Sequence, residues 1–249
     1  MTPLLSAHNI GYRVGNAQLL EEVNVDVAGG ELVAVIGPNG AGKSTLVSVL
    51  AGDLKPSAGS VEIGGTDITT IDGAELARMR AALGQGRTPG IPFSVAEVVA
   101  MGDRSSGNGG TSVVAEAMAA MDVADLADRI VGSLSGGEHT RVELARILVQ
   151  DTEVILLDEP LAALDIAHEE RVMRHLRSVA ESGRGVLAVL HDLNAAAAHA
   201  HRFVLLGAGR VVADGSADEV LDAALLSDVY GHPMSVNRVD GRLVVLPRD

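Results

Sequence analysis

A glycine-rich stretch that ends in a lysine constrains the fold of this chain more than any other feature. Residues 37–45 read Gly-Pro-Asn-Gly-Ala-Gly-Lys-Ser-Thr and match the pattern G-x-x-x-x-G-K-[ST]. The chain has 249 residues with 29 glycines but only 2 lysines, so chance would produce this pattern roughly 0.003 times in a sequence of this composition. An apolar run at residues 31–36 precedes the stretch, and a helical pattern at residues 43–51 follows it. The sequence therefore predicts a strand, a phosphate-binding loop and a helix, in that order.

The chemistry of such a loop explains its residue types. Glycines allow successive backbone N–H groups to point at phosphate oxygens, and the following helix presents its positive N-terminus to the same anion. Lys43 is expected to reach the outer two phosphates of a nucleotide, and the Ser44 hydroxyl is expected to bind Mg²⁺. The glycine spacing does not match the dinucleotide pattern G-x-G-x-x-G, so we reject a Rossmann interpretation. The predicted phosphate-binding residues are Gly37, Pro38, Asn39, Gly40, Ala41, Gly42, Lys43, Ser44 and Thr45.

Two acidic residues follow a second apolar run, at residues 154–157. Asp158 is placed to hold Mg²⁺, directly or through water, and Glu159 is placed to polarise the water that attacks the terminal phosphate. Two acids at a strand end can also simply face solvent, and this short motif is weak by itself. With a phosphate-binding loop upstream, the catalytic interpretation is favoured.

Composition narrows the class of protein. Apolar residues make up 47% of the chain and charged residues 21%, which is typical of a globular protein. Apolar strand-sized runs alternate with helical patterns, which indicates a parallel α/β sheet. The net charge of −14 argues against nucleic acid as a partner, and the absence of cysteine excludes a disulfide framework or a cysteine nucleophile. With neither a signal-like N-terminus nor an apolar run long enough to span a bilayer, we expect a cytoplasmic chain whose partner does any spanning.

A third motif, Leu-Ser-Gly-Gly-Glu at residues 134–138, identifies the chain as a member of a known family. Together with the two motifs above, it resembles the ATP-binding subunits of ABC transporters over about residues 4–230. The resemblance implies an α/β P-loop NTPase with a RecA-like parallel-sheet core, an N-terminal antiparallel β-subdomain and an inserted α-helical subdomain. It implies one domain over residues 1–249, with the core and β-subdomain in 1–85 and 151–230, the helical signature subdomain in 86–150, and a short C-terminal hairpin tail in 231–249.

The resemblance also implies site residues, cofactors and an assembly. ATP and Mg²⁺ are the expected ligands, and one chain carries one phosphate-binding loop and one signature, so two complete sites require a head-to-tail homodimer. Gln85 resembles the glutamine that contacts Mg²⁺ or the attacking water, and His191 resembles the histidine that contacts the terminal phosphate. By itself His191 would be read as a structural histidine at a strand end. The residues expected to reach the partner chain's ATP are Ser135, Gly136, Gly137 and Asp165.

Four positions depart from the family pattern: Leu161, Ala163 and His139, which remove no catalytic group, and Val14. An aromatic residue that stacks on adenine usually stands just before Gly15, where this chain has Val14. Tyr12 lies two residues earlier and would share a strand face with Val14 if the strand is regular. Tyr12 is therefore the remaining candidate for adenine stacking.

Short segments suggest which transporter this is. Residues 91–102 and 191–194 resemble importers of iron chelates, haem and cobalamin, and the C-terminal residues 220–247 most resemble haem importers. The implied partners are an integral membrane permease and an extracytoplasmic substrate-binding protein, with the ATPase on the cytoplasmic face of the membrane. A siderophore or cobalamin importer, an exporter and a non-transport ATPase remain alternatives.

Three apolar residues between Gln85 and Met101 are expected to contact the permease. They are Ile91, Phe93 and Val95, in a segment rich in glycine and proline. The alternative of comparable weight is that Phe93 packs inside a small helical subdomain. We expect His168, His175, His199 and His201 to be solvated or interface residues rather than haem ligands.

Overall fold

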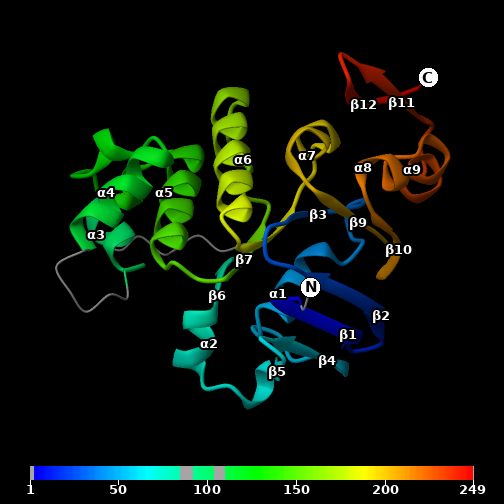
Figure 1. Cartoon of the computed structure of the whole chain (residues 1–249), viewed down its shortest axis with the longest axis horizontal. Helices are drawn as coiled ribbons and strands as arrows, with labels where there is room; N and C mark the ends of the chain where they lie inside the picture. The colour runs from blue at the N-terminus through cyan, green and yellow to red at the C-terminus, as the bar shows by residue number, and fades with distance from the viewer. Residues whose placement is uncertain (1–2, 85–91, 104–109, 249) are drawn as a thin grey trace.

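The computed structural model describes residues 3–84, 92–103 and 110–248. A six-stranded sheet forms its centre (Figure 1), with the strand order β10-β9-β3-β8-β7-β6. Five of these strands run parallel and β10 pairs antiparallel with β9. The strands are β3 (Leu32–Ile36), β6 (Arg80–Leu83), β7 (Val154–Asp158), β8 (Gly185–Val189), β9 (Arg202–Gly207) and β10 (Arg210–Gly215). The expected parallel α/β core is confirmed.

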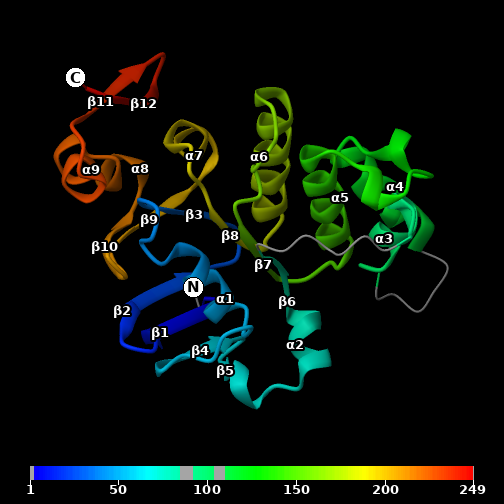
Figure 2. The ribbon, with the colours of Figure 1, turned by 180° about the vertical axis from the view of Figure 1, so that it is seen from behind.

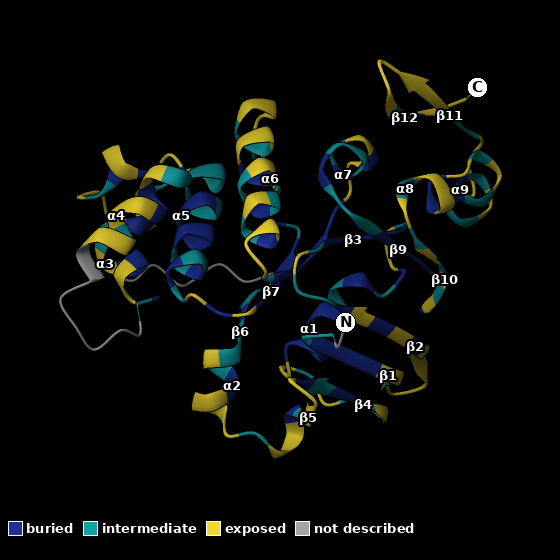
Figure 3. Cartoon of the chain, viewed as in Figure 1, coloured by how far each residue is buried: buried dark blue, intermediate teal, exposed yellow. Residues whose placement is uncertain are grey.

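Side-chain alternation along the strands divides the core into two layers. Every residue of β3, β7 and β8 is buried (Figure 3), as expected for strands covered on both faces. Along β3, Leu32, Ala34 and Ile36 belong to one apolar cluster, whereas Val33 and Val35 belong to the other. The helices of the chain's second half cover the first face, and α1 (Lys43–Leu50) covers the second.

A second sheet packs over α1. It is antiparallel with the order β2-β1-β4-β5, and it shares one buried cluster with α1 and the central sheet. Its strands are β1 (Leu5–Val14), β2 (Ala17–Val27), β4 (Ala58–Ile63) and β5 (Thr66–Asp67). The prediction of antiparallel strands in the first 30 residues is confirmed, and β4 and β5 complete that sheet from a segment whose pattern did not reveal them.

The helices between β6 and β7 form a group at one side of the molecule (Figures 1 and 2). The periodicity of residues 112–149 predicts helical structure with a break at 132–137, whereas in the structure the break extends over about residues 121–135 and contains two 3₁₀ turns. Ser94 and Ser135 each begin a helix through a capping box, with Glu97 and Glu138 as partners. The elements are α3 (Val95–Ala100), α4 (Gly110–Ala120), η2 (Ala124–Leu126), η3 (Val131–Ser133) and α5 (Gly136–Val149).

The C-terminal elements lie at the other side (Figure 2). The predicted hairpin is confirmed, and its turn residues Asp240 and Gly241 have φ of 49° and 80°, as a two-residue type I′ turn requires. Asn194 of α7 ties the hairpin to the core, because its side chain exchanges two hydrogen bonds with the Val245 backbone, of 2.8 and 3.2 Å. The remaining elements are η1 (Ile68–Thr70), α2 (Gly73–Met79), α6 (Ile166–Glu181), α7 (Leu193–His199), α8 (Ala217–Val220), α9 (Ala223–Tyr230), β11 (Met234–Val239) and β12 (Arg242–Pro247). None of the helices in the described ranges is long and apolar enough to cross a membrane.

Close packing of α3 against α5 leads to a stability prediction. A Cβ atom added at Gly102 would lie 2.1 Å from the carbonyl oxygen of Arg146, which is backbone and cannot move aside cheaply. We expect Gly102→Ala to reduce the free energy of unfolding by about 1–3 kcal/mol, the usual cost of overpacking. Chemical denaturation measures this change. Gly73→Ala is the matched control, since nothing lies within 4 Å of its added Cβ; equal losses in both variants would contradict the packing argument.

Candidate functional site

The phosphate-binding loop lies where β3 ends and α1 begins. Gly37, Gly40 and Gly42 have φ of 147°, 80° and 99°, a region that residues with a side chain rarely adopt. The loop is also tightly packed, because a Cβ at Gly37 would lie 2.1 Å from the Leu206 carbonyl oxygen of β9. Backbone conformation and space therefore both require the glycines that the sequence motif places there.

Lys43 lies at the centre of this loop. Its ammonium donates hydrogen bonds to the carbonyl oxygens of Gly37, at 2.7 Å, and Pro38, at 2.9 Å, and the residue is only 5% exposed. Burial lowers the pKa of the Lys43 ammonium, and the carboxylates of Glu159 and Asp158 oppose this shift. Among the described residues, the Lys43 ammonium donates its hydrogen bonds to two backbone carbonyl oxygens, and a buried positive charge in this position favours the binding of an anion.

The loop meets the two predicted acids across the sheet. The Ser44 hydroxyl donates to Asp158 Oδ1 at 3.1 Å, although the two residues are 114 positions apart in the sequence. Asp158 is buried at the end of β7, and this burial raises the pKa of its carboxyl group, against the effect of the Ser44 hydrogen bond. A hydroxyl and a carboxylate oxygen in this arrangement suit a hard cation such as Mg²⁺.

Glu159 and His191 face each other beside the loop. His191 Nε2 lies 2.8 Å from Glu159 Oε1, and the two residues follow the ends of β7 and β8. Glu159 has a φ of 53°, a strained value for a residue with a side chain. Since β8 lies between β3 and β7, the three strand ends bring the loop, the acids and His191 to one edge of the sheet.

Two small hollows converge on this pair. One, of about 220 Å³, is lined by Glu159, His191 and the loop, together with Leu19 of β2. The other, of about 250 Å³, is lined by Glu159, His191 and residues 161–163. Pockets that enclose small molecules usually measure roughly 300–1,000 Å³. Each hollow, as the described residues line it, is smaller than this range.

The signature residues line neither hollow, although Gly137 packs against Ala163, which lines the second one. Ser135 is exposed at the start of α5, and its hydroxyl accepts the backbone N–H of Glu138 at 3.3 Å. Gly136 and Gly137 form the first turn of α5, and Asp165 caps α6, accepting the backbone N–H of His168 at 2.9 Å. None of these four residues lines either hollow in the described part of the chain.

Three predicted residues fall outside this arrangement. Gln85 and Ile91 lie outside the described residues. Tyr12 is half-buried and packs against the apolar cluster of the β-subdomain, whereas Val14 is 55% exposed. The strand register shifts between Tyr12 and Arg13, so the assumption of a regular strand is wrong.

Leu19 lines the hollow at the loop although no sequence motif predicts it, and Glu169 and Asp192 line the second hollow in the same way. The carbonyl oxygen of Leu19 would lie 2.7 Å from a Cβ on Gly42, so β2 lies directly against the loop. No motif marks this residue, because only the packing of the β-subdomain over α1 brings it there.

His199 of α7 and His201, which follows α7, contact other parts of the chain. His199 is buried, and its ring contacts Glu170 Oε2 at 2.8 Å. His201 Nδ1 accepts the backbone N–H of Leu32 at 2.9 Å. We expected both residues at the surface or at an interface; this expectation is wrong for His199, which is buried, whereas His201 is partly exposed.

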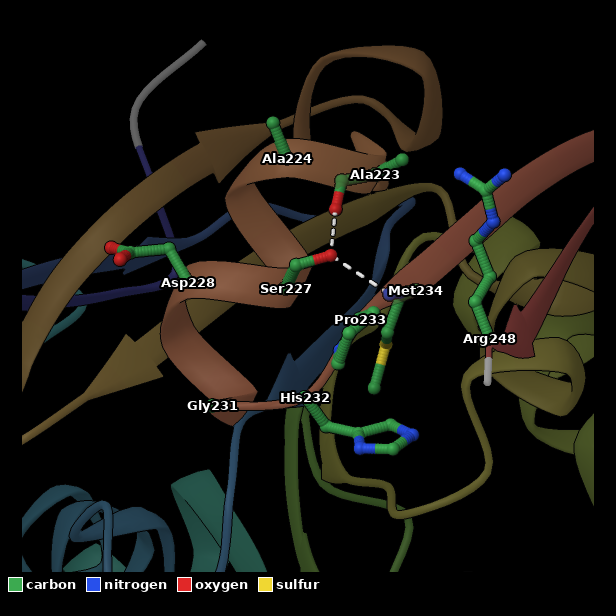
Figure 4. Close-up of a pocket in the computed structure, with 9 residues that line it drawn as sticks. All are labelled: Ala223, Ala224, Ser227, Asp228, Gly231, His232, Pro233, Met234 and Arg248. Atoms are coloured by element: carbon green, nitrogen blue, oxygen red, sulfur yellow. Dashed lines mark hydrogen bonds between the residues drawn. The ribbon is translucent and has the colours of Figure 1, made fainter.

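A larger hollow, of about 810 Å³, lies between α9 and the C-terminal hairpin (Figure 4). The Ser227 hydroxyl lies between α9 and the hairpin, where it donates to the Ala223 carbonyl at 2.5 Å and accepts the Met234 N–H at 2.8 Å. Asp228 and Arg248 point away from each other at its two sides (Figure 4). The charged groups of this hollow do not converge, so it does not compete with the loop as the functional site.

A phosphate-binding loop on β3, acids on β7 and a histidine after β8 define a P-loop nucleotide-binding protein. The ABC transporter family model matches residues 20–162, and the chain belongs to this family. The predicted α/β P-loop fold is therefore confirmed, and the protein is an ABC-type transporter ATPase.

Three comparisons refine this assignment. The chain is 49% identical to the "Hemin import ATP-binding protein HmuV" of Nocardia farcinica, over 92% of this chain and 82% of that protein. A solved chain described as belonging to a metal-chelate type ABC transporter, in an inward-facing conformation, superimposes with a TM-score of 0.82 and 26% identity, covering 100% of this chain and 98% of that one. A dimeric bacterial ABC transporter cassette gives a TM-score of 0.76 and 28% identity, covering 85% of this chain and 98% of that one.

Proposed function

We propose that this chain hydrolyses ATP to power the import of haem through a separate membrane permease. The assignment of haem as the cargo rests on the similarity, over nearly the whole chain, to a hemin import ATP-binding protein. The nucleotide chemistry is supported by the loop, the acids and the histidine at one sheet edge. A siderophore or cobalamin importer is the alternative within the same class, because the ATPase does not itself need to touch the cargo.

In this proposal, Lys43 neutralises the outer phosphates of ATP, and the loop N–H groups hold the others. Ser44 and Asp158 fit Mg²⁺, since their oxygens lie 3.1 Å apart and neighbouring ligands of an octahedral ion at roughly 2.0–2.1 Å would lie about 2.9 Å apart. When bound, Mg²⁺ supplies positive charge to the phosphates. Gln85 is proposed as a further contact to the metal or to the attacking water.

Glu159 is the proposed general base. Its carboxylate would orient the attacking water and accept its proton, and the contact of 2.8 Å with His191 holds that carboxylate in place. His191 is the proposed hydrogen-bond donor to the terminal phosphate. The positive φ of Glu159 supports this role, because strained backbone is concentrated at functional sites.

We further propose that two chains form a head-to-tail homodimer with two ATP molecules between them. The hollow at the loop is small, and the exposed Ser135 with the α5 N-terminus is suited to contact an anion held by another chain. Ile166, which follows Asp165, is 85% exposed and is therefore available for contact with a second chain. The signature residues and Asp165 of one chain would therefore complete the site of the other.

The remaining partners follow from the import role. The proposed partners are an integral membrane permease, itself a dimer, and an extracytoplasmic substrate-binding protein. The ATPase would then lie on the cytoplasmic face of the membrane, attached through the permease.

Transport in reconstituted vesicles tests this function. The chain and its permease, with the substrate-binding protein on the outside, should take up haem only when ATP is supplied inside. Cobalamin and a ferric siderophore serve as alternative cargoes in the same vesicles. Uptake of either one instead of haem would contradict the cargo assignment and leave the ATPase assignment intact.

Exposed apolar residues of the helical group mark the proposed permease contact. Phe93 is 37% exposed, Met101 52% and Ile130 46%, and the Phe93 carbonyl oxygen accepts the Val131 N–H at 3.0 Å, beside Ile130. Val95 was expected in this surface, but it is fully buried, so that expectation is wrong. Val95 fills the core because it begins α3 and faces inward.

Phe93→Asp should therefore lower ATP-driven uptake about tenfold, since a charge at an aromatic anchor opposes docking. The isolated subunit should keep its ATPase rate, because Phe93 lines neither pocket. Permease pull-down and vesicle uptake measure the effect. Val113→Asp is the matched control, as an exposed apolar residue on α4 of the same group; equal uptake in both variants would place the contact elsewhere.

A further inference from the structure

Asp122, in the turn after α4, receives cationic groups from two other helices. Arg171 of α6 reaches its Oδ1 at 2.6 Å, His168 of α6 reaches its Oδ2 at 3.4 Å, and Arg141 of α5 reaches Oδ2 at 3.6 Å. Arg141 also donates to the backbone carbonyl oxygens of Met121 and Asp122. Asp122 adopts a positive φ of 57°, so this turn is held in a specific shape.

His168 connects this turn to Asp165. Its Nδ1 lies 2.8 Å from Asp165 Oδ1, the same oxygen that accepts the His168 backbone N–H and caps α6. Its Nε2 faces Asp122. The protonated ring donates to both carboxylates, and the neutral ring donates to one of them. The expectation that His168 is merely solvated is therefore wrong: the ring lies between two carboxylates from separate parts of the chain.

The signature segment contacts the same region from the other side. A Cβ at Gly137 would lie 2.6 Å from the carbonyl oxygen of Ala163, and Thr140 Oγ1 donates to the Ala162 carbonyl at 3.3 Å. Ala163 has a φ of 64°, so the loop before Asp165 bends around the start of α5. The signature and Asp165 thus share one packed region of the chain.

We propose that His168 and Asp122 form a bridge that fixes the position of Asp165 relative to the signature segment, residues 135–137. The two parts of the chain that approach the partner's ATP would then move as one body. This inference rests on the proposed dimer, and it names His168 as a positioning residue rather than a catalytic one. His168, Asp122 and Arg171 are partly exposed, and such ion pairs contribute little to folding stability. Their effect should therefore appear in dimer formation.

The experiment compares His168 variants in a Glu159→Gln background, in which ATP is bound without turnover. His168→Ala removes both contacts, His168→Asn keeps a donor near the Nδ1 position, and His168→Gln keeps one near the Nε2 position. Analytical ultracentrifugation with Mg-ATP measures the chain concentration at half-dimerisation. We expect His168→Ala to raise it about tenfold, a typical coupling between sites, with His168→Asn and His168→Gln intermediate. The ATP affinity of the monomer and the melting temperature should stay unchanged in all three.

Arg174→Ala is the matched control, because its ion pair with Glu170 lies on the exposed side of the same helix and touches neither carboxylate of the bridge. It should dimerise like the parent. If either His168→Asn or His168→Gln dimerises like the parent, one of the two His168 contacts is sufficient and the proposed bridge is overturned. A parallel loss of melting temperature or ATP affinity would overturn it too, by assigning His168 a purely structural role. A parent that stays monomeric with Mg-ATP would overturn the proposed dimer itself and this inference with it, whereas a dimeric parent with unaffected variants would overturn the bridge alone.

Discussion

Lys43→Ala should abolish tight ATP binding and lower ATP turnover by about 10²-fold or more, as expected when a preorganised charge on a transferring phosphoryl group is lost. The Lys43 ammonium lies within 2.7–2.9 Å of two loop carbonyl oxygens, at the place where the outer phosphates would bind. Titration with a fluorescent ATP analogue and a phosphate-release assay measure the two effects.

The sequence provides a matched control for this variant. Lys55 is the only other lysine of the chain, and it is exposed on the segment that follows α1. Lys55→Ala should bind and hydrolyse ATP like the parent. A folded Lys43→Ala variant with parental turnover would contradict the assignment of the phosphate-binding loop.

Glu159→Gln should keep ATP binding and lose hydrolysis by about 10²–10⁴-fold, the usual contribution of a general base. The amide keeps the shape of the side chain and its contact with His191, which is 2.8 Å in the parent, but it cannot accept the proton of the attacking water. Because the nucleotide is then not consumed, the variant should accumulate as an ATP-bound dimer. Size-exclusion chromatography with Mg-ATP measures the dimer, and single-turnover kinetics measures the chemical step.

Glu153→Gln is the corresponding control, since Glu153 is exposed just before β7 and lies outside both pockets. It should remain an active enzyme. A Glu159→Gln variant that hydrolyses ATP normally would exclude Glu159 as the base. A variant that is inactive but monomeric with ATP would retain the base and contradict the dimer.

Local patterns were enough for the features that depend on consecutive residues. The phosphate-binding loop, the acids after a buried strand and the hairpin turn at Asp240 each require special backbone geometry within a few residues, so the sequence must carry it. The helix that begins at Ser135 was predictable for the same reason, because a capping box is local. The ends of helices were less predictable from the sequence, because the break between α4 and α5 is wider than the apolar periodicity suggested.

Apolar patterns in the sequence do not show which apolar residues become buried and which stay exposed. Phe93 and Val95 look alike in the sequence, yet Phe93 is 37% exposed and Val95 is fully buried, since one precedes α3 and the other begins it facing the core. The stacking hypothesis for Tyr12 assumed a regular strand, and a register shift removes that assumption.

By itself, therefore, the sequence determined which chemical groups this protein has and the local elements that carry them. The order of strands in the sheet decided which groups meet. Ser44 and Asp158 lie 114 residues apart in the sequence, but they meet because β3 and β7 belong to the same sheet with only β8 between them. The same order places His191, which follows β8, beside Glu159, which follows β7. The bridge of Asp122, His168 and Asp165 joins helices far apart in the chain, and no local motif specifies it. Such contacts arise from the packing of whole elements, whose free energy is spread over many buried residues, so only the tertiary structure reveals them.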